Sequence, residues 1–199
     1  MFSDSCHIAH QTKRTWGIFT TLLIVLVLLI SPLAEAVETS LVPEYNVKAA
    51  FLVNFVRYTS WPEKSFVSPD APIIIGVLGA NPFGDVLAKT AQLQQGPRGI
   101  EFHQISSVEE AAKCQLVFIS EREKKNEALW IAALKDKPIL IVGESGQTIR
   151  RGGLLEFIVV KDRVRFDASL PAMDAAGLKC SAKMLASART VFRTNEEIH

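Results

Sequence analysis

From Pro72 onward the sequence alternates short apolar runs with helical or turn-like stretches, and this rhythm constrains the fold more than any other feature. The apolar runs predict buried strands at residues 73–78, 100–104, 116–120 and 139–142. Helical segments are predicted between them at 83–94, 108–112 and 124–134, the second opening on a Ser107–Glu110 capping box. Alternating strands and helices predict a three-layer α/β domain with a mostly parallel, doubly wound sheet.

The pattern changes after Val142. Residues 143–153 predict a loop, in which Gly152-Gly153 permits a backbone turn that side chains would obstruct. Strands are expected at 154–160 and 164–166, and their short connection predicts an antiparallel hairpin at the edge of the sheet. Two C-terminal helices are expected at 170–176 and 181–192.

A helix is predicted from Pro43 to Thr59, ended by Trp61-Pro62 because the residue before a proline avoids the helical region. Its apolar residues cover an arc wider than the roughly 100° stripe of an ordinary surface helix. The helix is therefore expected to be buried on two sides, by the sheet on one and by a partner or a second copy of the chain on the other. Phe51 and Phe55 are the predicted dimer-interface residues.

Residues 1–36 have the order of a secretory signal peptide. Lys13 and Arg14 precede an apolar run from Ile18 to Ile30, and an A-x-A site ends at Ala36. The alternative is an uncleaved signal anchor, since 16–33 could cross a thin bilayer. Cleavage would leave residues 37–199 as one domain exported to the periplasm.

Composition and cysteines limit the classes of function. The net charge is +1, and the signal peptide carries as many acidic as basic residues, so nucleic-acid binding is not expected. Cys6 leaves with the signal peptide. Cys114 and Cys180 are then the remaining cysteines, and in an oxidising compartment they could form one disulfide if their geometry permits.

No catalytic, cofactor or metal motif is found. The stretch 79–84 has the glycine spacing of a phosphate-binding loop, but Asp85 stands where that loop needs a lysine. Cys/His metal spacings and Ser/His/Asp sets are also absent from the sequence, so we expect no catalytic residues and no cofactor. A possible ligand crevice at the carboxyl ends of the strands would be lined by Asn81, Phe83, Ser120 and Arg122.

Basic residues cluster around the predicted hairpin. Lys161, Arg163 and Arg165 alternate with apolar residues and share one face of a strand, and Arg150 and Arg151 precede it. We interpret all five as a candidate partner-binding surface. The alternative is that the charges only protect an exposed sheet edge from aggregation.

Several segments carry a family resemblance. They are 45–52 with Phe55 and Trp61-Pro62, 76–84, 114–120, Arg151-Gly152-Gly153, and 163–166 leading into 176–179. In this order, behind a signal peptide, they resemble the YfiR-like family of periplasmic regulators.

The resemblance implies a non-catalytic dimer that represses a membrane-bound diguanylate cyclase by engaging its periplasmic sensor region. It thereby implies lower cyclic di-GMP and less biofilm formation. Ser169, Cys180 and a loop at 143–153 without cysteines depart from the family pattern, so redox behaviour is not implied. A periplasmic sensor that binds a small molecule and acts on another membrane signalling partner is the alternative function.

Overall fold

The apolar runs form the strands of the central sheet, as the sequence predicts. The computed structural model describes residues 41–93 and 96–198, and the predicted signal peptide lies outside these residues. The main sheet has seven strands, which are β2 (Ile73–Leu78), β3 (Ile100–Ile105), β4 (Leu116–Ile119), β5 (Leu140–Gly143), β6 (Leu155–Val160), β7 (Arg163–Ser169) and β9 (Thr190–Phe192). A separate two-stranded sheet pairs β1 (Thr59–Ser60) with β8 (Lys179–Cys180).

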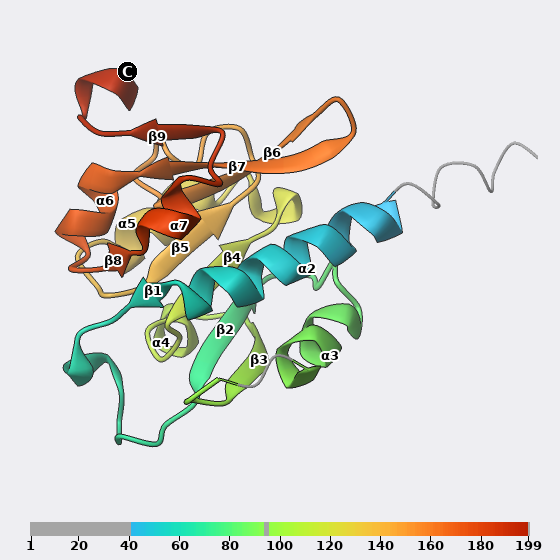
Figure 1. The fold of residues 1–199 in the computed structure, drawn as a ribbon, viewed down its shortest axis with the longest axis vertical. Coiled ribbons are helices and arrows are strands. Elements are labelled where there is room, and N and C mark those ends of the chain that lie inside the picture. Colours follow the sequence, from blue (N-terminus) through green and yellow to red (C-terminus); the bar gives the residue numbers. More distant parts are fainter. Residues whose placement is uncertain (1–40, 94–95, 199) are drawn as a thin grey trace, which may run out of the picture. The chain divides into compact units, whose positions relative to one another are not determined.

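The strand order of the main sheet is β3-β2-β4-β5-β6-β7-β9 (Figure 1). The strands from β3 to β6 run parallel, β7 is antiparallel to β6, and β9 is parallel to β7. Because β2 lies between β3 and β4, the strand order reverses there, as in doubly wound folds. The predicted α/β architecture is confirmed.

Helices and short 3₁₀ turns connect the strands. They are α2 (Leu41–Arg57), η3 (Glu63–Ser65), α3 (Val86–Leu93), α4 (Val108–Ala111), η4 (Glu121–Glu123), α5 (Glu127–Leu134), α6 (Leu170–Ala175), α7 (Ala182–Leu185) and η5 (Glu196–Ile198). The capping box at the start of α4 is confirmed, because Ser107 accepts from the Glu110 amide while Glu110 accepts from the Ser107 amide. Among the described residues, no helix is long and apolar enough to cross a membrane.

Helices cover both faces of the sheet. On one face, Phe55 of α2 packs against Phe157 of β6, with ring centroids 5.6 Å apart. On the other face, the neighbouring residue Glu156 accepts a hydrogen bond from the Thr148 amide at 2.8 Å. Figure 1 shows α2 crossing the near face of the sheet, with α5 behind it. The three layers expected from the sequence are therefore present.

The predicted helix at 181–192 is wrong in its second half. Helix α7 ends at Leu185, and Thr190, Val191 and Phe192 form strand β9. This strand pairs with β7 in parallel through Asp167–Thr190, Ala168–Val191 and Ser169–Phe192. β-Branched and aromatic residues suit a strand, and the open edge of β7 supplies the partner for their backbone groups.

This pairing also corrects the position of the hairpin. The β6–β7 hairpin is antiparallel as predicted, but β9 lies outside it and forms the edge of the sheet. Strand β9 reaches only the second half of β7, so residues 163–165 have no outer strand beside them in the described sheet. The basic half of β7 is thus still an open edge.

The broad apolar arc of α2 is covered largely by its own chain. Phe55 is 1% exposed, so it belongs to the core rather than to a dimer interface. Phe51 is partly buried and packs against Phe157 and Phe166. Beside it, a hollow of about 240 Å³ separates α2 from Met184 of α7. Dimerisation through this helix stays a prediction, but the apolar arc no longer requires it.

The two cysteines in the described part of the chain, Cys114 and Cys180, are not paired. Cys114 is buried, and its thiol donates to the Glu110 carbonyl at 3.5 Å. Cys180 lies in β8, where its sulfur is 3.4 Å from Thr59 Oγ1. The possible disulfide is therefore not formed, because each thiol has a separate environment.

We expect both thiols to react with a maleimide when the protein, purified without reductant, is denatured. In the native protein at pH 8, Cys114 should react far more slowly than in the denatured protein. Burial raises the pKa of its thiol to about 11, and the thiolate is the reactive form. Mass spectrometry of the labelled protein measures both rates. A denatured protein that takes up no label before reduction would contradict the free-thiol assignment.

Candidate functional site

The side chains of strand β7 alternate between the apolar core under α2 and a polar face on the other side of the sheet. Phe166 packs against α2 with a ring-centroid distance of 4.8 Å to a phenylalanine of that helix. Arg163, Arg165, Asp167 and Ser169 project from the opposite face, because successive side chains of a strand alternate. Two hollows open along this row, one towards each end of the strand.

The first hollow, which we call the basic hollow, has a volume of about 460 Å³ and is lined by Val160, Lys161, Arg163, Arg165 and Arg189. Arg189 Nε donates to Asp167 Oδ1 at 2.9 Å, and Nη2 contacts the other carboxylate oxygen. This hydrogen bonding to Asp167 raises the pKa of Arg189 and keeps its guanidinium charged. The hollow therefore presents four cations but no acidic side chain among its lining residues.

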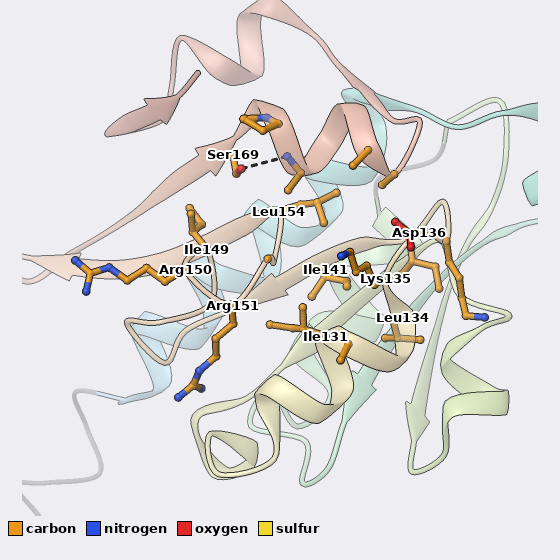
Figure 2. Close-up of a pocket in the computed structure, with 18 of the residues that line it drawn as sticks. Ile131, Leu134, Lys135, Asp136, Ile141, Ile149, Arg150, Arg151, Leu154 and Ser169 are labelled. Carbon is orange, nitrogen blue, oxygen red and sulfur yellow. Dashed lines mark hydrogen bonds between the residues drawn. The ribbon is translucent and has the colours of Figure 1, made fainter. Parts of the chain in front are cut away.

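The second hollow, which we call the α5–α6 groove, is the larger, with a volume of about 570 Å³ (Figure 2). Figure 2 shows Ile131, Ile141 and Leu154 at its floor, between the ribbons of α5 and α6. Charged side chains stand at its rim, namely Lys135, Asp136, Lys137, Arg150 and Arg151. An apolar floor with a few polar groups around it is the usual composition of a binding site.

Arg151 is held by a buried carboxylate. Its Nη1 donates to Glu127 Oε2 at 2.5 Å, and Glu127 is 0% exposed. Ser145 Oγ and Thr148 Oγ1 donate to the same carboxylate at 2.5 and 2.6 Å. Arg151 thus neutralises a buried charge and fixes the loop between β5 and β6, whereas Arg150 is exposed at the rim.

The glycine pair shapes this loop as expected from the sequence. Gly152 has φ +97°, which favours glycine. A Cβ on Gly153 would lie 2.4 Å from Thr148 Cγ2 and 3.0 Å from the Thr148 carbonyl oxygen. The same threonine donates its amide to Glu156, and burial raises the pKa of Glu156 against the lowering effect of that hydrogen bond. Close packing at this turn therefore positions the groove rim.

The predicted basic set is divided between the two hollows. Lys161, Arg163 and Arg165 line the basic hollow, and the structure adds Arg189 to them. Arg150 and Arg151 line the α5–α6 groove. Arg189 could not be placed from the sequence, because the strand that brings it beside β7 was predicted as a helix.

A buried charge cluster at the carboxyl ends of β4 and β5 was also missed. Lys48 of α2 is 4% exposed, and its Nζ contacts Glu44 and lies 2.5 Å from Glu144 Oε2. Glu144 also accepts from Tyr45 Oη at 3.2 Å and from the Glu121 amide at 2.8 Å. Burial, followed by the charge of Glu144, raises the pKa of Tyr45. These contacts bind the start of α2 to the sheet.

The predicted ligand crevice is filled by the chain itself. Phe83 is 3% exposed, and its ring packs against Tyr45 and Phe118 at centroid distances of 5.4 and 5.1 Å. Asn81 accepts from the Phe83 amide and so caps its own turn. Ser120 is buried, and its hydroxyl has no partner among the described residues.

Arg122, the fourth predicted crevice residue, is exposed. Neither Arg122 nor the other three lines either hollow on the polar face. The structure thus brings the four predicted residues to no common hollow, because the Phe83 ring is packed into the core.

Metal binding gains no support from the structure. In the ranges 41–93 and 96–198, no group of three or more His, Cys, Asp or Glu side chains could hold a metal ion. The two hollows on the polar face of the sheet are the candidate functional site.

Comparison with solved structures is consistent with the α/β architecture. An ABC domain in complex with L-Trp from Streptococcus pneumonia and a conserved domain protein from Vibrio cholerae O1 biovar El Tor are each 10% identical to this chain, with TM-scores of 0.50. Each match covers 72% of this chain and 60% of the other chain. Identity this low shows a shared fold alone.

No curated protein matches the chain. A protein-family model matches residues 45–189, which include every strand of the main sheet except β9. The matched region contains Lys48, the hairpin, the charged rim of the α5–α6 groove and all the residues that line the basic hollow. The chain belongs to the YfiR/HmsC-like family.

Proposed function

We propose that this protein is a non-catalytic periplasmic regulator that represses a membrane-bound diguanylate cyclase by binding its periplasmic sensor region. Repression would lower cyclic di-GMP and biofilm formation. Membership of the YfiR/HmsC-like family supports a regulator of this kind. The α5–α6 groove carries the proposal, because it combines an apolar floor with an exposed, mainly basic rim.

The composition of the groove indicates the kind of partner surface that fits it. Ile131 and Leu154 are buried at its floor, so a partner side chain that enters can exclude water from apolar surface. Lys135 and Arg150 are exposed at the rim and can orient a partner of opposite charge. We therefore expect an apolar anchor flanked by acidic residues in the partner.

Deleting the gene should raise cellular cyclic di-GMP and surface attachment in cells that contain a membrane cyclase with a periplasmic domain. The wild-type gene should reverse both effects. Ala175→Trp, on the exposed groove side of α6, should not reverse them, because the indole would fill the groove. Overpacking costs about 1–3 kcal/mol, which corresponds to roughly a fivefold to 150-fold loss of affinity.

Ala128→Trp is the matched control, because Ala128 is exposed on α5 and is not a lining residue of the groove. It should restore repression, and both variants should be exported and folded. Binding of the protein to the purified periplasmic domain of the cyclase should show the same difference. Unchanged cyclic di-GMP after deletion of the gene would rule out the repressor function.

A second candidate function is binding of a small molecule. The groove volume of about 570 Å³ lies within the roughly 300–1,000 Å³ typical of ligand pockets. A carboxylate with an apolar body suits the floor and rim, and L-Trp, named for one structural neighbour, is a suitable first probe. Thermal stabilisation by L-Trp that Ala175→Trp abolishes would favour this function.

A further inference from the structure

The tip of the β6–β7 hairpin projects from the sheet as a two-stranded arm (Figure 1). Strand β5 pairs only with Leu155 and Glu156 of β6, and β9 pairs with β7 only from Asp167 onward. Within the hairpin, residues 158–160 and 163–165 pair only with each other, whereas Phe157 and Phe166 are buried under α2. Lys161 and Asp162 form the turn with φ values of 50° and 58°. Such two-residue turns match the twist of their strands, so the arm has a defined shape.

Apolar side chains are exposed at this tip. Val159 is 49% exposed and Val160 is 40% exposed, although valine in a strand is normally packed. The two valines lie on opposite faces of the arm, because neighbouring residues of a strand alternate. Val160 shares its face with Arg163, and Val159 shares its face with Val164. The tip therefore presents apolar surface on both sides.

The basic hollow lies directly behind the tip. Lys161, Arg163 and Arg165 are all exposed, and Arg189 completes the hollow while it remains paired with Asp167. Cations placed around one hollow repel one another, and an anion in the hollow would relieve that repulsion. The volume of about 460 Å³ is ample for a phosphate group with attached atoms.

We infer that the hairpin tip docks on an anionic phospholipid surface, with a lipid phosphate in the basic hollow and Val159 and Val160 in the interfacial layer. An acidic protein surface would satisfy the cations but would meet only one side of the arm. A lipid surface surrounds an inserted tip and covers both valines. Lipid docking would place the regulator beside a membrane-bound partner and so deepens the proposed function. The cellular setting of this inference rests on that proposed function.

The binding is expected to be weak and reversible. Each basic side chain near an anionic membrane contributes on the order of a fivefold gain in partitioning, and salt screens this contribution. Removing two such charges should therefore weaken binding about 25-fold. The valines should add a part of the affinity that salt does not remove, because burial of apolar surface is not screened.

The test is co-sedimentation of protein from the periplasmic fraction with vesicles of phosphatidylglycerol and phosphatidylcholine, or of phosphatidylcholine alone. We expect binding to the anionic vesicles only. The double variant Arg163→Ala/Arg165→Ala should bind about 25-fold more weakly. Its matched control, Lys89→Ala/Lys113→Ala, removes two exposed basic residues elsewhere and should bind as wild type. Circular dichroism verifies the fold of each variant.

Three results would overturn the inference. The first is equal binding of Val159→Ser/Val160→Ser and wild type to anionic vesicles, since the tip would then not enter the lipid. The second is binding of glycerol phosphate or inorganic phosphate at the arginines without binding to vesicles, which identifies a soluble ligand. The third is a wild-type protein that binds the purified cyclase domain but not vesicles, together with loss of that binding in the arginine variant. This result would identify an acidic protein surface as the occupant of the hollow.

The inference and the proposed function fail separately. Vesicle binding involves purified components only, whereas repression is measured by cyclic di-GMP after gene deletion. Absence of vesicle binding together with raised cyclic di-GMP would leave the proposed function intact. Vesicle binding without any effect of deletion would leave the lipid site intact and remove the repressor function.

Discussion

Replacing Lys48 by methionine is expected to lower the free energy of unfolding by about 3–5 kcal/mol, as for other buried ion pairs that lose one partner. Methionine keeps the length of the side chain, so the loss comes mainly from charge. The Glu144 side chain is 4% exposed and would remain buried without its cation. Tyr45 and the Glu121 amide would still donate to it, but neither carries a positive charge.

Equilibrium unfolding in urea measures this effect, and Lys89→Met is the matched control. Lys89 also forms an i,i+4 ion pair with an aspartate of the same segment, but the two side chains are 72% and 88% exposed. Its replacement should change stability by less than about 0.5 kcal/mol. A similar loss for both variants would show that burial of the Lys48 cluster is not the cause.

A second variant isolates the buried charge. Lys48→Met/Glu144→Gln removes both charges, and the new amide oxygen can still accept from Tyr45 and from the backbone. It should recover much of the stability lost in Lys48→Met, because replacing both members of a buried pair is often nearly neutral. A double variant less stable than Lys48→Met would contradict the assigned role of Glu144 as an uncompensated charge.

The cluster explains why α2 lies where other doubly wound folds often bind ligands. The carboxyl ends of the strands near the switch in strand order form the usual crevice. Here Lys48, Tyr45 and Phe83 occupy that region, so the chain fills its own crevice. A hollow of about 420 Å³ remains beside this cluster, lined by Lys48, Glu121 and Glu144 among others. The two hollows of the candidate site lie on the opposite face of β6 and β7. The fold alone therefore does not decide which of these hollows is the functional one.

Strands β2, β4 and β5 could be predicted because their residues are largely buried on both faces and read as continuous apolar runs. The hairpin was predictable from its short turn, and the α4 capping box from local side-chain spacing. Strand β9 was not predictable, because its backbone is satisfied by β7 rather than by its own sequence neighbours. Tertiary pairing overrides a short amphipathic pattern of this kind.

The candidate site was only partly predictable for a related reason. Arg163 and Arg165 share a face because strands alternate, and that follows from sequence alone. The ion pair between Lys48 and Glu144 joins residues 96 positions apart, and no local pattern indicates it. Arg151 was expected beside the hairpin cations but is bound to Glu127, since the turn at Gly152 directs the loop towards α5.

Replacing Phe55 by alanine is expected to lower the free energy of unfolding by about 3–5 kcal/mol, the range for aromatic truncation in a core. Phe55 is 1% exposed and lies between Phe51, Phe157 and Phe166. Because these contacts lie within one chain, the loss should not depend on protein concentration. Urea unfolding at two concentrations, together with light scattering, distinguishes this core role from a role in association.

Two further variants make the Phe55 test specific. Val67→Ala removes a side chain that is 99% exposed and should change stability by less than about 0.5 kcal/mol. Phe51→Ala should cost less than Phe55→Ala, because Phe51 is only partly buried beside the hollow next to α7. If Phe55→Ala instead separates a dimer into monomers of unchanged stability, α2 is an interface helix and the core assignment of Phe55 is wrong.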